Sequence, residues 1–549
     1  MRALLPHTLL PRARVRARSF SLSSAVDFRF VRDNVDLVER NARERNSPGD
    51  ARLVARLYAE YGALQAGVDS LRGARRAIAS SAGDAAGRVE EGRRLKGELA
   101  AAEARLENVR VSLEAAAREL PTLSHPDAPV GPEKCAVEIM RGGVPRTTFL
   151  DDNESQVGTA SRAGRAFKPR DHVELCRLLG IAEFERTADA ISGAGFVTFV
   201  NEGVELELAI TQWALARLRK EGFMLTMPPD LARASLVEAC GFNPRRSVCA
   251  SDAQGTLTEQ VKISTFPHVS SQVYSVAGSP LCLVGTGEIP LAGLHASQLL
   301  PSRKDKSFPL LYAALTHCFR HEAGGGGAAS RGLYRLHQFT KVEMFAYSAP
   351  HEPGSLADVD EARQYLADVR EAALVSALCR QKVTVSSTMS PVPRHAASDA
   401  LLCRLVDIQV SLVRELGLAF RVLDMPTEEL GASAHRKVDI EAWMPCRGMA
   451  GGDAIAGGGS YGEITSASLC ADFQARRLGV RFRGDGDVGT RFMHTLNATG
   501  AAVPRLVLAI LETHQRADGS VKVPECLRPF MGGRDRILPK KPATVLYRP

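Results

Sequence analysis

The fold of this 549-residue chain is decided by Leu333-Tyr334-Arg335-Leu336-His337-Gln338-Phe339-Thr340-Lys341-Val342-Glu343. Every second residue from His337 to Glu343 is charged, polar or aromatic, and side chains two positions apart project from the same face of a β-strand. We therefore predict a strand from Gly332 to Tyr347 with one functional face. A glycine-rich stretch separates it from Phe319-Arg320-His321-Glu322-Ala323-Gly324.

The same spacing of two recurs in three other short stretches. Arg320 pairs in this way with Glu322, Thr286 with Glu288 inside Gly285–Pro290, and Asn497 with Thr499. If each stretch is a strand, one polar floor of a sheet could carry all of these side chains. A strand is also predicted at Gly479–Arg483, and a helix by the spacing of Val503, Leu506, Val507, Ile510 and Leu511. The pattern indicates an α+β domain with a largely antiparallel sheet.

Two heptad series precede this domain. The first contains Leu57, Tyr61, Leu64, Val68, Leu71 and Ile78, and the second contains Leu95, Leu99, Ala102, Leu106, Val109, Leu113, Ala116 and Leu120. Ser80–Asp84 reads as a turn between them, so we predict an antiparallel coiled-coil hairpin about 40 Å long. A proline-rich linker follows Leu120-Pro121. The predicted division is residues 1–26, a helical arm at 27–130 and a catalytic domain at 131–549.

Basic residues gather toward the predicted tip of the hairpin. They are Arg72, Arg75, Arg76, Arg88, Arg93, Arg94 and Lys96. Such a cluster could bind the phosphates of a nucleic acid, and the net charge of +8 is compatible with a polyanionic partner. A solvated coiled coil that serves only for dimerisation would show a similar pattern.

Residues 1–26 have the composition of an organelle transit peptide. They contain five arginines, several serines and no acidic residue before Asp27. We expect a mitochondrial matrix address, while a plastid address and a disordered basic tail remain the alternatives. The chain has no apolar run of about 18 residues, so no membrane span is expected. Its cysteines form no C-x-x-C pair, which gives no indication of a zinc site or a disulfide framework.

Three stretches together resemble one enzyme family. The segment Phe319–Glu343 resembles motif 2 of the class II aminoacyl-tRNA synthetases, in particular the seryl enzymes. Leu496-Asn497-Ala498-Thr499-Gly500 with Val503-Pro504-Arg505 resembles motif 3, and Gly222–Pro229 resembles the end of motif 1. The resemblance implies an ATP-dependent, AMP-forming ligase that activates L-serine and transfers it to the 3′ end of tRNA(Ser). It also implies a homodimer, Mg²⁺ with the ATP, and a role for the arm in binding tRNA(Ser).

Site residues follow from the resemblance, position by position. The implied serine-binding residues are Thr286, Gly287, Glu288, Glu343 and Thr499. The implied ATP-binding residues are Arg320, His321, Glu322, Phe339, Glu463, Ile464, Thr465, Ser466 and Arg505, with Glu463 and Ser466 as the magnesium-holding pair. Arg320 would contact the α-phosphate and the serine carboxylate, Glu322 would contact the adenine, and Phe339 and Arg505 would sandwich that base.

Two other functions are compatible with parts of the sequence. Class II enzymes for proline, threonine, histidine or glycine would normally carry an anticodon-binding domain of about 100 residues after motif 3, and this chain ends at Pro549, soon after Arg505. A non-enzymatic, seryl-synthetase-like RNA-binding protein would lose the motif residues, which are present here. Its one support is Ala328-Ala329-Ser330 before Arg331-Gly332, where the family usually has two charged residues.

Overall fold

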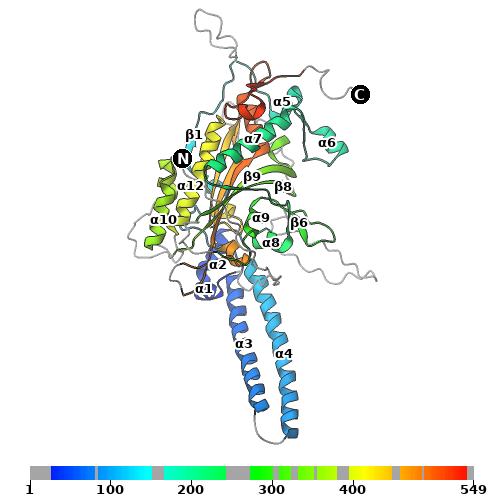
Figure 1. Ribbon diagram of the computed structural model, residues 1–549, viewed down its shortest axis with the longest axis vertical. Helices are drawn as coiled ribbons and strands as arrows, with labels where there is room; N and C mark the ends of the chain where they lie inside the picture. The colour runs from blue at the N-terminus through cyan, green and yellow to red at the C-terminus, as the bar shows by residue number, and fades with distance from the viewer. Residues whose placement is uncertain are drawn as a thin grey trace, which may run out of the picture.

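A helical arm extends from a body built on one large sheet in the computed structural model (Figure 1). The structure describes residues 26–80, 85–150, 166–242, 273–300, 308–322, 332–351, 355–379, 395–447, 458–484 and 488–540. The predicted transit peptide, apart from Val26, and the unusual Ala328-Ala329-Ser330 lie outside these residues. No helix in the described ranges combines the length and apolar character needed to cross a bilayer.

The predicted hairpin is confirmed. Helices α3 (Ala51–Ser80) and α4 (Ala85–Arg118) run side by side away from the body (Figure 1). Val68, Leu95 and Leu99 of the two heptad series are buried along the shared seam. Burial of an apolar stripe is what holds two such helices together.

Two helices at the base of the arm were not predicted individually. They are α1 (Phe28–Asp33) and α2 (Val35–Glu44), and the side chain of Asp27 accepts hydrogen bonds from the backbone at the start of α1. Val31, Val38, Val54, Leu113 and Leu120 form a small apolar core between these helices and the base of the hairpin. The arm is thus fixed at its base by its own core.

Arg45 joins the base of the arm to the body. Its guanidinium donates to the backbone carbonyls of Thr122 and Ala434, each at 3.0 Å, and to that of Gly431. Burial lowers the pKa of Arg45 to about 9, because neutral carbonyls stabilise its charge less than a carboxylate would. Further bonds cross the same junction, including 2.5 Å from the Thr427 hydroxyl to the carbonyl of Glu44.

The body contains an eight-stranded sheet of order β1-β10-β11-β12-β15-β9-β8-β4. Every neighbouring pair is antiparallel except β4 with β8, which confirms the predicted α+β fold. In that order the strands are Val137–Gly142, Phe420–Asp424, Arg436–Met444, Ser460–Ala471, His494–Ala502, Gln338–Ser348, Leu310–Phe319 and Met224–Thr226.

The two faces of the sheet are covered unequally. Three long helices, α7 (Glu202–Lys220), α12 (Ala396–Glu415) and α14 (Val503–His514), pack on one face and form the main core with residues such as Val342, Ala498 and Ile464 (Figure 1). Short helices α8 (Ala234–Ala239), α9 (Glu288–Gly293) and α13 (Phe473–Leu478) cover only part of the other face. The rest of that second face is left for polar side chains.

The remaining elements lie around these layers. The helices are α5 (His172–Leu179), α6 (Glu185–Ala190), α10 (Leu356–Leu366) and α11 (Ala372–Leu378). The short strands are β2 (Ala182–Glu183), β3 (Thr198–Phe199), β5 (Leu231–Arg233), β6 (Leu281–Leu283), β7 (Leu299–Leu300), β13 (Arg481–Phe482), β14 (Arg491–Phe492), β16 (Val521–Lys522) and β17 (Arg536–Ile537).

Two strand predictions were wrong at their ends, and a third was wrong altogether. The strand expected from Gly332 begins only at Gln338, because Gly332–Tyr334 form a 3₁₀ turn. Arg320 and Glu322 follow the last residue of β8 rather than lying within it. Thr286 and Glu288 are not on a strand either: β6 ends at Leu283, and Glu288 is the first residue of α9. A spacing of two is too short a signal to separate a strand from a loop that enters a helix.

Candidate active site

The polar floor is made by three adjacent strands of the sheet. Lys341 and Glu343 come from β9, Asn497 and Thr499 from β15, and Ser466 from β12. Their neighbours Val342 and Ala498 face the main core, so the alternation of each strand turns the polar set to the opposite face. Thr499 lies directly opposite Glu343 in the ladder between β15 and β9.

Thr286 and Glu343 are joined by a lysine that the sequence did not single out as a ligand. The Lys341 Nζ donates to Thr286 Oγ1 at 2.9 Å and forms an ion pair with Glu343 Oε2 at 2.5 Å. All three side chains are buried. Gly287 closes the group, because a Cβ there would lie only 3.0 Å from the Cβ of Glu343. The predicted serine-binding residues from the two segments therefore meet in one enclosed cluster.

Glu288 lies in the same cluster and is held by two amides. Its Oε1 accepts a hydrogen bond from Asn497 Nδ2 at 2.8 Å and another from Gln474 Nε2. Gln474 is itself oriented by the hydroxyl of Thr495, at 2.7 Å. Gln474 and Asn497 were not among the predicted ligands. Asn497 could have been found from its spacing with Thr499, whereas Gln474 comes from α13 and gave no local signal.

Burial raises the pKa of both carboxyl groups. The pKa of Glu288 is raised to about 7 by burial and by the nearby charge of Glu343, against the opposing effects of Lys341, Gln474 and Arg320. Burial also raises the pKa of Glu343, and here Lys341 and Arg320 oppose the shift. An incoming ammonium group would favour the ionised form of both. The cluster is suited to a small cationic group with hydrogen-bonding neighbours.

We expect ligand binding at this cluster to weaken below neutral pH. As the pH falls through about 7, the empty site protonates Glu288 and loses a negative charge that an ammonium group needs. Between pH 8 and pH 6, the apparent KM for an amino-acid substrate should therefore rise by about tenfold. Steady-state measurements across this range test the expectation, with the KM for nucleotide as the internal control. A KM that stays constant over this range would contradict it.

The predicted nucleotide-binding residues lie next to this cluster. Arg320 donates from Nε to the carbonyl of Gly285 at 3.1 Å, and its guanidinium lies 5.3 Å from the centre of the Phe339 ring. Glu322 is near Arg335, with 4.0 Å between Oε2 and Nη1. Arg335 was missed as a site residue, although it lies inside the predicted motif. The ring of His321 is 5.5 Å from that of Tyr274.

Arg505 occupies the first turn of α14, as predicted. Its guanidinium lies 4.6 Å from the centre of the Tyr334 ring and pairs with Glu463 Oε2 at 3.1 Å. Arg447 approaches the same tyrosine, at 4.1 Å. Tyr334 thus stacks on two arginines, a contact that an aromatic base could compete for.

Glu463 and Ser466 share one face of β12 because the strand is bulged. Residues three apart on a regular strand face opposite sides, but the pairing of β12 with β11 skips Ile464. Partial desolvation opposes the charge of Glu463, yet Arg505, Lys437 and Arg320 outweigh it and lower its pKa to about 2. A fixed carboxylate beside a hydroxyl is an oxygen set that suits Mg²⁺.

The bulge turns the side chains of two predicted ATP-binding residues away from the polar face. The side chain of Ile464 is buried in the main core, and the hydroxyl of Thr465 donates to the carbonyl of Thr499 at 2.6 Å. Both side chains therefore point to the face of the sheet that carries the long helices. The sequence motif placed all four residues from Glu463 to Ser466 together, but only the first and last present their side chains to the polar face.

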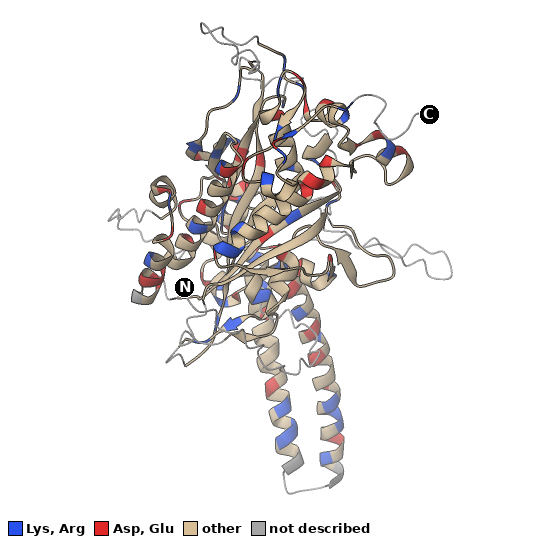
Figure 2. Ribbon diagram, turned by 45° about the horizontal axis from the view of Figure 1, so that its top comes forward, with Lys and Arg blue, Asp and Glu red and all other residues tan. Residues whose placement is uncertain are grey.

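The predicted basic residues of the arm differ in how they are paired. Arg72 binds Glu103 at 2.9 Å, and Arg94 binds Glu98 at 2.7 Å and also Glu91. No ion pair involves Arg75, Arg93 or Lys96 within the described part of the chain, and all three are exposed. Figure 2 shows both signs of charge along the two arm helices. The unpaired cations are thus the better candidates for contact with a polyanion.

Comparisons with known proteins match both parts of the molecule. Residues 26–124 match the family described as Seryl-tRNA synthetase N-terminal domain, and residues 274–514 match the tRNA synthetase class II core domain (G, H, P, S and T). The Serine--tRNA ligase of Treponema denticola is 35% identical over 515 residues, which is 92% of this chain and 99% of the relative. The Serine--tRNA ligase of Rubrobacter xylanophilus is also 35% identical, over 92% of this chain and 98% of the relative.

Solved structures agree with these matches. The seryl-tRNA synthetase from Pyrococcus horikoshii complexed with ATP superposes with a TM-score of 0.70 at 28% identity, over 94% of this chain and 100% of that one. The cytoplasmic Serine-tRNA ligase from Naegleria fowleri in complex with AMP superposes with a TM-score of 0.66 at 21% identity, over 94% of this chain and 99% of that one. At this identity the match supports the fold alone.

Proposed function

Because the chain belongs to the seryl-tRNA synthetase family, we propose that its polar floor activates serine with ATP and that its arm binds tRNA(Ser). The protein is a serine–tRNA ligase with a class II core. In the first step a serine carboxylate oxygen attacks the α-phosphorus of ATP. The bond from that phosphorus to the bridging oxygen of the β-phosphate breaks, and pyrophosphate leaves with the electron pair.

The observation that carries this assignment is the enclosed cluster of Thr286, Glu288, Lys341 and Glu343 beside Arg320. Its two carboxylates suit the serine ammonium, and its hydroxyl and carboxylate acceptors suit the serine hydroxyl. Arg320 lies where it can neutralise the serine carboxylate and the α-phosphate as charge accumulates on them. The step needs positioned cations rather than a nucleophilic side chain.

Amino-acid-dependent pyrophosphate exchange with all twenty amino acids tests the assignment without tRNA. Serine alone should support rapid exchange. Alanine should be rejected by about 10⁴-fold or more, because it leaves buried polar groups unpaired, whereas threonine must be excluded by the shape of the pocket. Exchange with another amino acid, or with none, would remove the assignment and would favour a binding protein without ligase activity.

The resemblance also implies Mg²⁺, and the residues present fit it. Glu463 would hold it through a carboxylate and Ser466 through a hydroxyl, and the ion would neutralise phosphate charge. We predict that Glu463→Gln raises the Mg²⁺ concentration for half-maximal exchange by about tenfold, since the neutral amide binds a dication more weakly. Magnesium titrations of exchange measure this, with Glu138→Gln, an exposed surface change, as the control. An unaltered magnesium requirement in the folded variant would exclude Glu463 as a ligand.

Apolar exposure at the end of the sheet supports a homodimer. Strand β4 is an edge strand, and Met224, Met227 and Leu231 are 49%, 77% and 43% exposed. Leu208 of α7 is also exposed. Several exposed apolar side chains beside an unpaired strand edge are typical of a covered surface. The molecular mass in solution tests the proposal: a dimer is expected, and Met227→Glu with Leu231→Glu should give monomers.

The arginine-rich start of the chain is proposed to direct the enzyme to mitochondria. Residues 1–26 carry arginines and serines without an acidic residue. A fusion of these residues to a fluorescent protein should accumulate in the mitochondrial matrix. Replacing Arg12, Arg14, Arg16 and Arg18 by glutamine should leave the reporter in the cytosol. Accumulation in plastids, or a diffuse signal from the unaltered fusion, would contradict the mitochondrial address.

A further inference from the structure

Strands β12 and β15 separate where the two substrates must meet. Their ladder extends from Ala467 opposite Ala498 to Ala471 opposite Thr495, with one irregularity at Cys470. Beyond it, β12 continues toward Glu463 paired only with β11, and β15 continues past Thr499 paired only with β9. Each strand is bulged here, at Ile464 and at Gly500. The proposed magnesium-holding pair, Glu463 and Ser466, therefore stands on β12, whereas Thr499 of the proposed serine site stands on β15.

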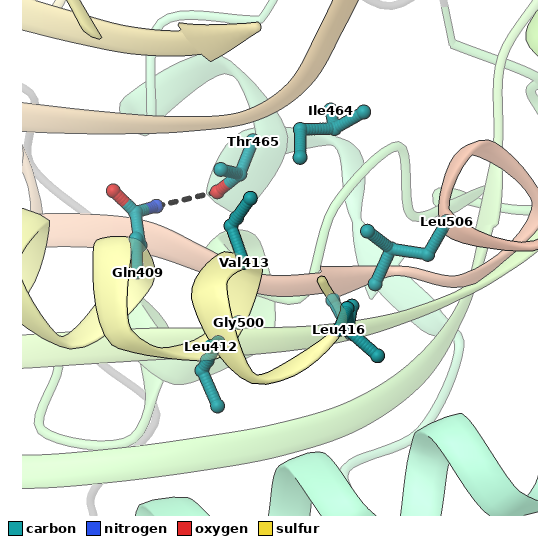
Figure 3. A pocket seen from close by; sticks show the side chains of 9 residues that line it. Gln409, Leu412, Val413, Leu416, Ile464, Thr465, Gly500 and Leu506 are labelled. Carbon is teal, nitrogen blue, oxygen red and sulfur yellow. Dashed lines mark hydrogen bonds between the residues drawn. The ribbon is translucent and has the colours of Figure 1, made fainter. Parts of the chain in front are cut away.

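Gln409 of α12 closes this gap from behind the sheet. Its Nε2 lies 2.5 Å from Thr465 Oγ1, 2.8 Å from the carbonyl of Ser466 and 2.9 Å from the carbonyl of Thr499. Thr465 Oγ1 in turn donates to the Thr499 carbonyl at 2.6 Å. Figure 3 shows the Gln409 amide directed at Thr465 between the helix and the strands.

The hydrogens are sufficient for this arrangement. The amide of Gln409 supplies two, one to Thr465 and one to the Ser466 carbonyl, and the hydroxyl of Thr465 supplies a third to the Thr499 carbonyl. Together they replace the ladder bonds that β12 and β15 do not make with each other. Gln409 is 1% exposed and Thr465 is 6% exposed, so water does not compete for these bonds.

A glutamine at position 409 is unfavourable if packing is its only role. Gln409 Oε1 has no hydrogen-bond partner in the described structure, and the small cavity beside it is lined mainly by apolar side chains. These include Leu412, Val413, Leu416, Ile464 and Leu506 (Figure 3). A buried acceptor without a partner costs about 1–3 kcal/mol. A leucine or methionine would pack here without that cost, which points to a purpose beyond packing.

We propose that Gln409 is a positioning residue for serine activation, which holds the strand carrying Glu463 and Ser466 in register with the strand carrying Thr499. The proposal rests on the proposed function. The residue touches neither substrate, but the attacking carboxylate and the α-phosphorus must be aligned to within a fraction of an ångström. Without these hydrogen bonds, the end of β12 that carries Glu463 and Ser466 could shift relative to the end of β15 that carries Thr499. Each strand would itself remain intact.

The first test is Gln409→Met, which keeps the size of the side chain and removes its hydrogens. In serine-dependent pyrophosphate exchange, kcat should fall by about tenfold or more, while the KM for serine and the KM for ATP each change by less than about threefold. Ser411→Ala on the same helix is the matched control, because among the described residues that hydroxyl bonds only the carbonyl of Ile408, and the change should leave exchange unaltered. Unaltered kcat in the methionine variant, with or without a lower melting temperature, would reduce Gln409 to a packing residue and overturn the proposal.

The second test, Gln409→Glu, gives a readout that simple destabilisation does not move. An ionised glutamate has no hydrogen to donate and repels the two carbonyl oxygens, whereas its protonated form can donate to one of them. Burial raises the pKa of a carboxyl group here, and none of the residues that line the cavity is titratable. The kcat of this variant relative to the unaltered enzyme should therefore rise as the pH falls from 8 to 6. A ratio that is flat or falls with decreasing pH would overturn the proposal.

These outcomes remain separate from a failure of the proposed function. If the unaltered enzyme shows no serine-dependent exchange, the ligase assignment fails. If the unaltered enzyme exchanges normally and the Gln409 variants match it in kcat and in pH profile, only the role of Gln409 fails.

Discussion

Replacing Glu343 by alanine should reduce serine-dependent pyrophosphate exchange by about 10³-fold. The carboxylate lies in an enclosed cluster, with Lys341 at 2.5 Å and Thr499 opposite it in the ladder. Its removal takes away the proposed acceptor for the serine ammonium and hydroxyl and leaves the buried lysine without its carboxylate partner. Two lost hydrogen bonds to the substrate, at about 1.5–3 kcal/mol each where a charged group takes part, would remove about 4 kcal/mol of transition-state stabilisation, and each 1.4 kcal/mol corresponds to a factor of ten.

Two further variants separate catalysis from folding in this experiment. Glu343→Gln keeps the shape and removes the charge, so it should retain the fold and lose most of the exchange. Gln338→Ala, at the exposed start of the same strand, should behave as the unaltered enzyme. Circular dichroism and the melting temperature report the fold. Near-normal exchange in a folded Glu343→Gln variant would show that serine binds elsewhere.

Replacing Arg75, Arg93 and Lys96, which form no ion pair in the described part of the arm, by glutamate should lower kcat/KM for aminoacylation of tRNA(Ser) by about 10²-fold or more. Arg75, Arg93 and Lys96 are exposed on the hairpin, well away from the polar floor, so their change to glutamate should leave pyrophosphate exchange within about twofold. The reason is that each cation can bind a phosphate and release counterions, while each glutamate repels it. Charging by the unaltered enzyme should also weaken with added salt much more than exchange does.

Arg110→Gln is the matched control for the arm. This arginine lies nearer the base of α4 and is held by Glu107 and Glu114, at 2.6 Å each, so its loss should change charging little. Measurements of initial rates of charging and of exchange on the same preparations decide the matter. If the triple variant charged tRNA(Ser) as well as the unaltered enzyme, the hairpin would not bind tRNA through these residues. A coiled coil that serves only for dimerisation would then be the better interpretation.

Much of the molecule is determined by local patterns in the sequence. The hairpin follows from two heptad series because a repeated apolar stripe specifies a partner helix without any distant residue. Lys341 and Glu343 on one face of β9, and Asn497 with Thr499 on β15, follow from the alternation of a strand. The motif residues Arg320, Glu343 and Arg505 were found because the family resemblance is itself local in sequence.

Only the tertiary structure decided the features that depend on register and on distant contacts. The bulge at Ile464 turns Glu463 and Ser466 to one face, and α9 rather than a strand brings Glu288 beside Glu343. Lys341, Gln474 and Gln409 acquire their roles from partners far along the chain. The physical reason is that a bulge shifts a strand by one residue without leaving a distinctive pattern, and that the pairing of a buried polar group depends on which elements pack together.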